Sequence, residues 1–248
     1  MFIVYGLLNQ KDNINNINIT GISDQPVSIM DCGNLYAIVS PSNIQQVSQP
    51  SKNDLLAYHH VIDYFHKDHT IIPMRFGSTF EITTALSDYV AKNNESFIQV
   101  FNRISGCSEM GINVISIGPH KKDATNTKKY ASGIDYLTKR KQHYHQIDQA
   151  IDDIRNIEKI ISHEFKGMFL EMRKERKTPM TGKGLWSFYF LVKKENIQRF
   201  SETFNEIRLE THNKWMLSGP WPPFNFVTEE KKTQGLPLES LIQGGSYE

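Results

Sequence analysis

The sequence predicts an α+β protein of two domains: a small N-terminal α+β domain and a ferredoxin-like C-terminal domain with a helical insertion. Short apolar runs typical of strands alternate with stretches of helical period. From residue 70 onward, these elements follow the order strand, helix, strand, strand, helix, strand of a ferredoxin-like sheet. The length of 248 residues also favours two cores, because single cores commonly stop growing at about 100 to 200 residues. We expect domains at 1–69 and 70–227, with a polar tail at 228–248.

The N-terminal domain is expected to be a compact unit of strand, hairpin and helix. Residues 2–8 (FIVYGLL) are apolar throughout, as in a strand buried on both faces. The runs 27–30 and 35–40 form a predicted hairpin, since Gly-Asn between apolar runs is a turn signal. A helix follows over 51–69, with Ser51 as its N-cap.

The C-terminal domain is expected to begin with the strand 70–80, although Pro73 interrupts its pattern. The later elements, in chain order, are helices at 83–92 and 95–105, strands at 109–118 and 185–192, a helix at 196–207 and a strand at 214–219. The remaining segment, from about 119 to 183, is therefore predicted to be an insertion between the second and third strands.

The insertion carries a heptad-type stripe that predicts a helix. Apolar residues recur at alternating spacings of 4 and 3, with Glu158 in one seat; they are Ile147, Ile151, Ile154, Ile161, Phe165, Met168 and Met172. We expect this helix to pack within its own chain. An intermolecular coiled coil is the alternative interpretation.

Composition and motifs exclude several classes of function. The hydrophobic fraction of 39% and the net charge of +1 describe a folded protein without the basic excess of a nucleic-acid or anionic-membrane binder. The start has no signal-peptide pattern, and no apolar run is long enough for a membrane span. Cys32 and Cys107 stand far apart, so neither a disulfide framework nor a zinc site is indicated and a cytoplasmic location fits best.

Catalytic and metal chemistry find little support in the sequence. His66 and His69 have the spacing of a ligand pair, but no further ligand is near, so we interpret them with His59 and His60 as exposed helix residues. No nucleophile motif or acid–base pair is recognisable. We therefore predict a protein that is not an enzyme and that needs no cofactor or metal.

Arg75 lies inside a strand pattern, between Met74 and Phe76. A guanidinium at the edge of a core requires a carboxylate or carbonyl partner. Glu109 and Glu81 are the nearest acidic candidates in the sequence, so we expect a structural ion pair rather than a catalytic role.

The stretch LSGPWPPFNF (217–226) combines stiffness with large apolar side chains. Pro220, Pro222 and Pro223 lack N–H donors, so the chain is expected to leave the sheet after Gly219 and run extended. We expect the aromatic residues Trp221, Phe224 and Phe226 to clamp one domain onto the other. A P-x-x-P ligand for an aromatic groove is the alternative.

These motifs together resemble the GvpL/GvpF family of gas vesicle proteins, and the short chain and tail are more similar to GvpF. The resemblance is carried, in order, by YG (5–6), IIPMRFGSTF (71–80), EMGINV (109–114), SGIDYL (132–137), FYFLV (188–192) and LSGPWPPFNFV (217–227). The structural motif residues that we single out are Arg75, Phe76, Gly77, Glu109, Gly219, Pro220, Trp221, Pro222, Pro223 and Phe224.

The resemblance implies two α+β domains, the second a modified ferredoxin-like fold, and a non-enzymatic, minor component of gas vesicles in the cytoplasm. It also implies contact with the apolar shell protein GvpA, whose aggregation it would prevent during vesicle nucleation, and contact with other gas vesicle accessory proteins. Nucleic acid and lipid membrane are not expected partners. We expect an edge of the second domain or its insertion helices to contact the shell protein. The alternatives are a scaffold that self-associates through the helical insertion and a small-molecule enzyme on the ferredoxin-like sheet.

Overall fold

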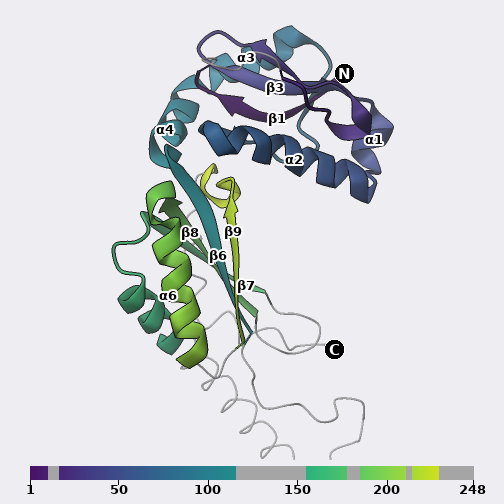
Figure 1. The fold of residues 1–248 in the computed structure, drawn as a ribbon. Helices are drawn as coiled ribbons and strands as arrows, with labels where there is room; N and C mark the ends of the chain where they lie inside the picture. The colour runs from purple at the N-terminus through teal and green to yellow at the C-terminus, as the bar shows by residue number, and fades with distance from the viewer. Residues whose placement is uncertain (11–16, 116–154, 178–184, 211–213, 229–248) are drawn as a thin grey trace, which may run out of the picture.

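The computed structural model describes residues 1–10, 17–115, 155–177, 185–210 and 214–228. Two antiparallel sheets lie one above the other, with helices on their faces (Figure 1). The predicted α+β class is therefore confirmed. The first three residues of the predicted stripe, Ile147, Ile151 and Ile154, and most of the predicted tail lie outside the described residues.

The first sheet is built around β1 (Phe2–Leu8), as its unbroken apolar sequence predicts. Its order is β2-β3-β1-β4, and β5 also pairs with β1. The other strands are β2 (Ser28–Asp31), β3 (Tyr36–Pro41), β4 (Ile71–Pro73) and β5 (Thr79–Phe80). The predicted hairpin is confirmed, because β2 and β3 pair antiparallel.

Helices cover both faces of this sheet. They are α1 (Ile44–Ser48), α2 (Lys52–Asp68), α3 (Thr83–Lys92) and α4 (Asn94–Ile104). On one face, Ile3 and Tyr5 of β1 pack with residues of α2 such as Phe65. On the other face, Val4 and Leu7 pack against α3 and α4. Ser51 caps α2, because its side chain accepts a hydrogen bond from the Asp54 N–H.

The second sheet has the order β7-β8-β6-β9 and is antiparallel throughout. Its strands are β6 (Cys107–Ile115), β7 (Glu171–Lys177), β8 (Leu185–Lys193) and β9 (Lys214–Trp221). A helix that includes residues 155–164 precedes β7, and α6 (Ile197–Glu210) precedes β9. The chain order β6, helix, β7, β8, α6, β9 is that of a ferredoxin-like sheet.

The predicted assignment of strand 70–80 to the second sheet is wrong. Ile72 of β4 lies opposite Leu7 of β1, and Thr79 of β5 lies opposite Ile3, so both strands complete the first sheet. The first strand of the ferredoxin-like sheet is instead β6. We therefore propose to divide the chain between α4 and β6 rather than at residues 69 and 70.

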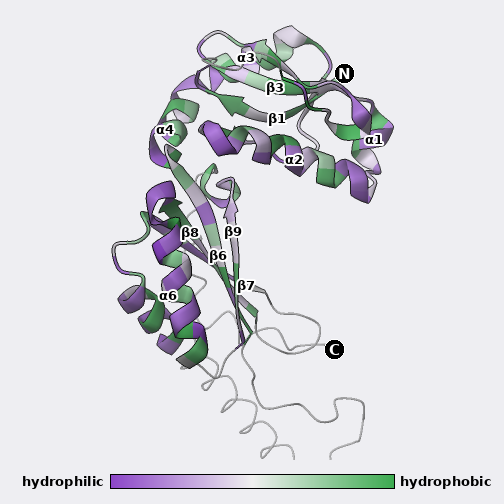
Figure 2. Cartoon of the chain, viewed as in Figure 1, coloured by the Kyte–Doolittle hydropathy of each residue, from purple (hydrophilic) through white to green (hydrophobic). Residues whose placement is uncertain are grey.

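The expected insertion contains part of the ferredoxin-like sheet itself. Met172 does not end a helical stripe but lies in β7, where it pairs with Phe190. The stripe residues Ile161, Phe165 and Met168 are buried against the second sheet and α6. The described part of the stripe thus packs within its own chain. Hydrophilic and hydrophobic residues alternate around α2 and α6, as one-sided packing of these helices requires (Figure 2).

Candidate functional site at the junction of the two sheets

The segment after β9 returns from the second sheet to the first. It forms a short 3-10 turn, η3 (Phe224–Phe226). Phe226 is fully buried in a core cluster that includes Val4 and Phe101 of the first domain and Leu191 of β8. Phe224 packs against the cluster beneath α2, and its ring lies 5.7 Å from that of His59. The two phenylalanines therefore join the sheets, as the clamp prediction expects.

A buried carboxylate fixes this returning segment. Glu109 of β6 is 5% exposed and accepts two hydrogen bonds from Asn225, one from the backbone N–H at 2.8 Å and one from the side-chain amide at 2.7 Å. Burial raises the pKa of Glu109, and the two hydrogen bonds from Asn225 oppose that rise. The carboxylate thereby ties β6 to the turn that carries Phe226.

Two arginines complete the polar frame around Phe226. Arg103, near the end of α4, donates to the Phe226 carbonyl. The Arg173 guanidinium of β7 lies 5.3 Å from the centre of the Phe226 ring and donates to the Thr228 carbonyl at 3.0 Å. An arginine over an aromatic face adds a cation–π attraction. Helix α4 of the first domain and strand β7 of the second sheet therefore each contribute a cation to the segment around this turn.

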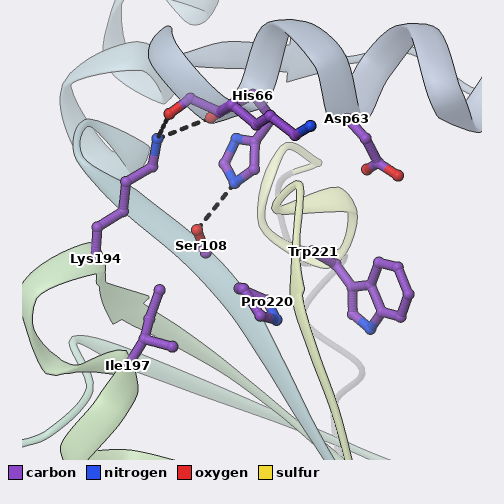
Figure 3. Close-up of a pocket in the computed structure, with 8 residues that line it drawn as sticks. Asp63, His66, Ser108, Lys194, Ile197, Pro220 and Trp221 are labelled. Atoms are coloured by element: carbon purple, nitrogen blue, oxygen red, sulfur yellow. Dashed lines mark hydrogen bonds between the residues drawn. The ribbon is translucent and has the colours of Figure 1, made fainter.

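The C-terminal end of α2 forms the other contact between the sheets. His66 Nε2 lies 2.9 Å from Ser108 Oγ of β6. Lys194, directly after β8, donates to the carbonyls of His66 at 2.7 Å and Lys67 at 2.9 Å (Figure 3). The last carbonyls of a helix have no partner within the helix and carry partial negative charge, so an ammonium group stabilises them. Lys194 therefore anchors α2 to the second sheet.

His66 is held in its neutral form by this position. Burial, and secondarily the charge of Lys194, lower its pKa to about 4. Its side chain is only 8% exposed, so the prediction that the α2 histidines are exposed is wrong for His66. His66 is buried because its ring faces Ser108 of the second sheet.

A cavity of about 400 Å³ opens at this junction. Figure 3 shows Asp63 and His66 of α2 above it and Pro220 and Trp221 of β9 below. The residues that line it are Asp63, His66, Lys67, Ser108, Lys194, Ile197, Pro220 and Trp221. Most of these positions are polar or charged, yet Ile197, Pro220 and Trp221 give the cavity an apolar floor.

Trp221 departs from the clamp prediction. It is 48% exposed, whereas Phe226 is fully buried. The chain also does not leave the sheet after Gly219: β9 continues to Trp221, which lies opposite Glu109 beyond a register shift. The sheet tolerates Pro220 because β9 is an edge strand, where the missing N–H need not serve a further strand. Of the two P-x-x-P prolines, Pro220 is exposed but Pro223 is buried, which argues against a P-x-x-P ligand.

Gly219 has a steric reason to be glycine. Its φ is 104°, and a Cβ at this position would lie 2.6 Å from the Glu109 carbonyl oxygen. Any side chain would therefore push β9 away from β6. The same residue lets the strand bend into the junction.

The remaining predicted motif residues lie apart from the cavity. Arg75 is exposed, and within the described residues no ion pair joins it to Glu109 or Glu81. The expected pair with Glu109 is wrong, because Asn225 occupies that carboxylate. Phe76 packs edge-on against Tyr58, with ring centres 5.1 Å apart, and Gly77 has a φ of 92° in the turn between β4 and β5.

The junction also uses residues that the sequence analysis did not single out: Arg103, Ser108, Lys194 and Asn225. Of these four residues, only Asn225 lies in a motif that the sequence analysis identified, the proline-rich segment 217–226. Among the described residues, no group of three or more His, Cys, Asp or Glu could hold a metal ion. No helix in the same part of the chain is long and apolar enough to span a membrane.

The fold and the junction define the class of protein. It is an α+β protein with two sheets, and the polar contacts described above hold these sheets together. The chain belongs to the GvpL/GvpF family, since the family model described as "Gas vesicle synthesis protein GvpL/GvpF" matches residues 1–228. This confirms the resemblance and gives the protein a role in gas vesicles.

Individual relatives agree with this assignment. "Gas vesicle protein F" of a Streptomyces strain is 22% identical over 238 residues, which cover 90% of this chain and 98% of the relative. The crystal structure of the gas vesicle protein GvpF from Anabaena sp. PCC7120 matches with a TM-score of 0.72 at 17% identity. That of GvpF from Microcystis aeruginosa matches with a TM-score of 0.71 at 15% identity. Each structural match covers 92% of this chain and 98% of the other, and at such identities it establishes the fold.

Proposed function

We propose that this protein is a non-enzymatic accessory component of gas vesicles that binds the apolar shell protein GvpA and keeps it from aggregating during vesicle nucleation. Family membership over residues 1–228 supports the gas vesicle role. It also favours partners among the gas vesicle proteins, in the cytoplasm where these organelles form. Contact with GvpA requires a surface on this protein that an apolar partner can bind.

This step rests on exposed apolar side chains, which both domains carry and among which we consider those of the second domain. Large apolar residues that are 38 to 82% exposed there include Leu170, Met172, Leu209, Met216 and Trp221. A subunit that forms a gas-filled wall must present a water-repelling face, which aggregates unless another surface covers it. Exposed apolar groups on a folded, otherwise polar partner can provide such a cover.

The test is co-expression of the tagged chain with GvpA, followed by affinity capture. We expect GvpA to stay in the supernatant and to co-purify with the tag. If GvpA sediments equally with and without this protein and is not captured, the chaperone-like function is wrong. Isolated vesicles should then be probed for the protein as a wall component.

A deletion within the insertion tests whether that region contributes to the contact. It must end before residue 155, because the helix at 155–164 and β7 belong to the second sheet and its core. Unchanged capture of GvpA after removal of about residues 120–150 would exclude this part of the insertion from the contact. Self-association through the insertion, the scaffold alternative, would instead appear as concentration-dependent oligomers of the purified chain that the deletion abolishes.

A further inference from the structure

We propose that the outer edge of β9 and the cavity at its end form one docking site for an extended apolar segment of the shell protein, with Trp221 as the main contact. The inference rests on the proposed function and specifies where and how the partner binds. It accounts for the part of the proline-rich motif that takes no role in joining the sheets.

The two edges of the second sheet differ sharply in charge. β7 is one edge, and six of its seven residues (EMRKERK) are charged. Among the strands that the structure describes, β9 is the other edge, and only Lys214 among its eight residues (KWMLSGPW) is charged. Edge strands offer unpaired N–H and C=O groups, and charged side chains are a usual protection against unwanted pairing. β9 lacks that protection along most of its length, so it is the edge suited to receive another strand.

The exposed side chains of β9 favour an apolar partner. Met216 is 49% exposed and Trp221 is 48% exposed. Methionine and tryptophan are enriched in protein interfaces, and tryptophan is among the residues that most often dominate their binding energy. A partner segment with several charges would leave these two side chains uncovered and would have to desolvate its own charges.

The cavity explains why the partner segment should be extended. It adjoins Pro220 and Trp221, the last residues of β9 (Figure 3). A partner strand that pairs along β9 would end beside these two residues. The cavity volume of about 400 Å³ is large enough for one or two apolar side chains. Strand addition commonly works in this way, since main-chain hydrogen bonds supply affinity and a side-chain pocket supplies specificity.

Lys194 and His66 fix the walls of the cavity before a partner binds. Lys194 fixes the end of α2 over the second sheet, and the His66–Ser108 hydrogen bond fixes the same helix to β6. The upper and lower walls therefore do not have to be brought together when the partner binds. Such preorganisation reduces the entropic cost of binding.

Capture of GvpA by the full-length chain provides the first test. Trp221→Ala removes the main contact, and Met216→Lys places a charge on the edge. Ile44→Ala is the matched control, because Ile44 of α1 is 73% exposed and lies outside the cavity and β9. We expect each β9 variant to weaken GvpA binding at least about tenfold, as for a central interface residue, while the control binds as the parent chain does.

A crosslink provides a second test that does not depend on losing binding. Cys32 and Cys107 are buried, so Met216→Cys introduces an accessible thiol at the edge that can carry a photoreactive group. We expect illumination to crosslink this chain to GvpA, and Ile44→Cys carrying the same group to give no such product.

The outcomes separate this inference from the proposed function. If the parent chain captures GvpA and all variants do so equally, the β9 site is wrong and the function stands. If the parent chain fails to capture GvpA, both fall together. A second copy of this chain in the site would appear as a dimer that Trp221→Ala dissociates, and that result would overturn the assignment to GvpA.

Discussion

The two ends of the proline-rich motif have opposite surroundings. Phe226 is fully buried between the sheets, with Arg173 over its ring and Arg103 bound to its carbonyl, whereas Trp221, five residues earlier, is 48% exposed beside an open cavity. Aromatic residues that are neighbours in the sequence can therefore serve different purposes. The buried end stabilises the junction, and the exposed end is free for a partner.

Phe226→Ala should have the largest effect on the buried end. Truncation of a fully buried phenylalanine costs about 3 to 5 kcal/mol, because it removes apolar contacts and leaves a cavity. Urea unfolding at neutral pH measures this loss as a lower midpoint. A change below about 1 kcal/mol would mean that the two sheets fold without this contact, and the comparison would fail.

Acidification should weaken the junction through His66. Its pKa falls from 6.5 in the unfolded chain to about 4 in the folded protein, so the unfolded state binds the proton first. The stabilising contribution is complete above pH 6.5 and is lost as the pH falls toward 4, by at most about 3 kcal/mol at 1.36 kcal/mol per pKa unit.

The free energy of unfolding at pH 7 and pH 4.5 should therefore differ more for the parent chain than for His66→Gln. Glu109, whose pKa is raised, works in the opposite direction: the folded state takes up its proton first as the pH falls. Because both chains keep Glu109, the difference between them reports on His66. Equal pH dependence in the two chains would contradict the neutral, buried state of this histidine.

Asn225→Ala should have an intermediate effect. It removes one of two hydrogen bonds to a buried carboxylate, and an underbonded buried acceptor costs about 1 to 3 kcal/mol. The backbone N–H of residue 225 still donates to Glu109, which keeps the loss below that of Phe226→Ala. A double-mutant cycle with Glu109→Gln measures the coupling, and a coupling near zero would show that the amide contact contributes nothing to stability.

Trp221→Ala should have the smallest effect on stability. The side chain is half exposed and occupies no sealed core position, so we expect a change of less than about 1 kcal/mol. Thermal unfolding of the variant beside Phe226→Ala gives the comparison directly. A loss as large as that of Phe226→Ala would mean that both ends of the motif act as the clamp.

Most strands of the first sheet and most helices could be predicted from the sequence, because the patterns that indicate them are local. Residues 2–8 are apolar throughout, and Ser51 with Asp54 forms a local capping box. β7 was missed for a physical reason. Its sequence EMRKERK has no apolar alternation, since an edge strand can place charges on both sides of the sheet. Met172 happened to extend the heptad spacing of the preceding helix.

The junction was only partly predictable. The proline-rich motif identified the correct segment, and stiffness plus aromatic residues correctly suggested that it joins the domains. Which aromatic side chain is buried depends on the path of β9 past Pro220 and on the register shift opposite Glu109, both of which are long-range features. The partnership of Lys194 with the end of α2 spans 128 residues to His66, and no local pattern announces it.

The burial of Phe226 also affects the order in which the protein folds during its synthesis. The first sheet is made of residues 2–80, which leave the ribosome early, yet the cluster on one of its faces is closed by Leu191 and Phe226. During synthesis, when domains usually fold from the N-terminus onward, α3 and α4 can cover that face early, but its last buried contacts form only after Phe226 has been made. The N-terminal domain is thus the first to be translated and among the last to be finished.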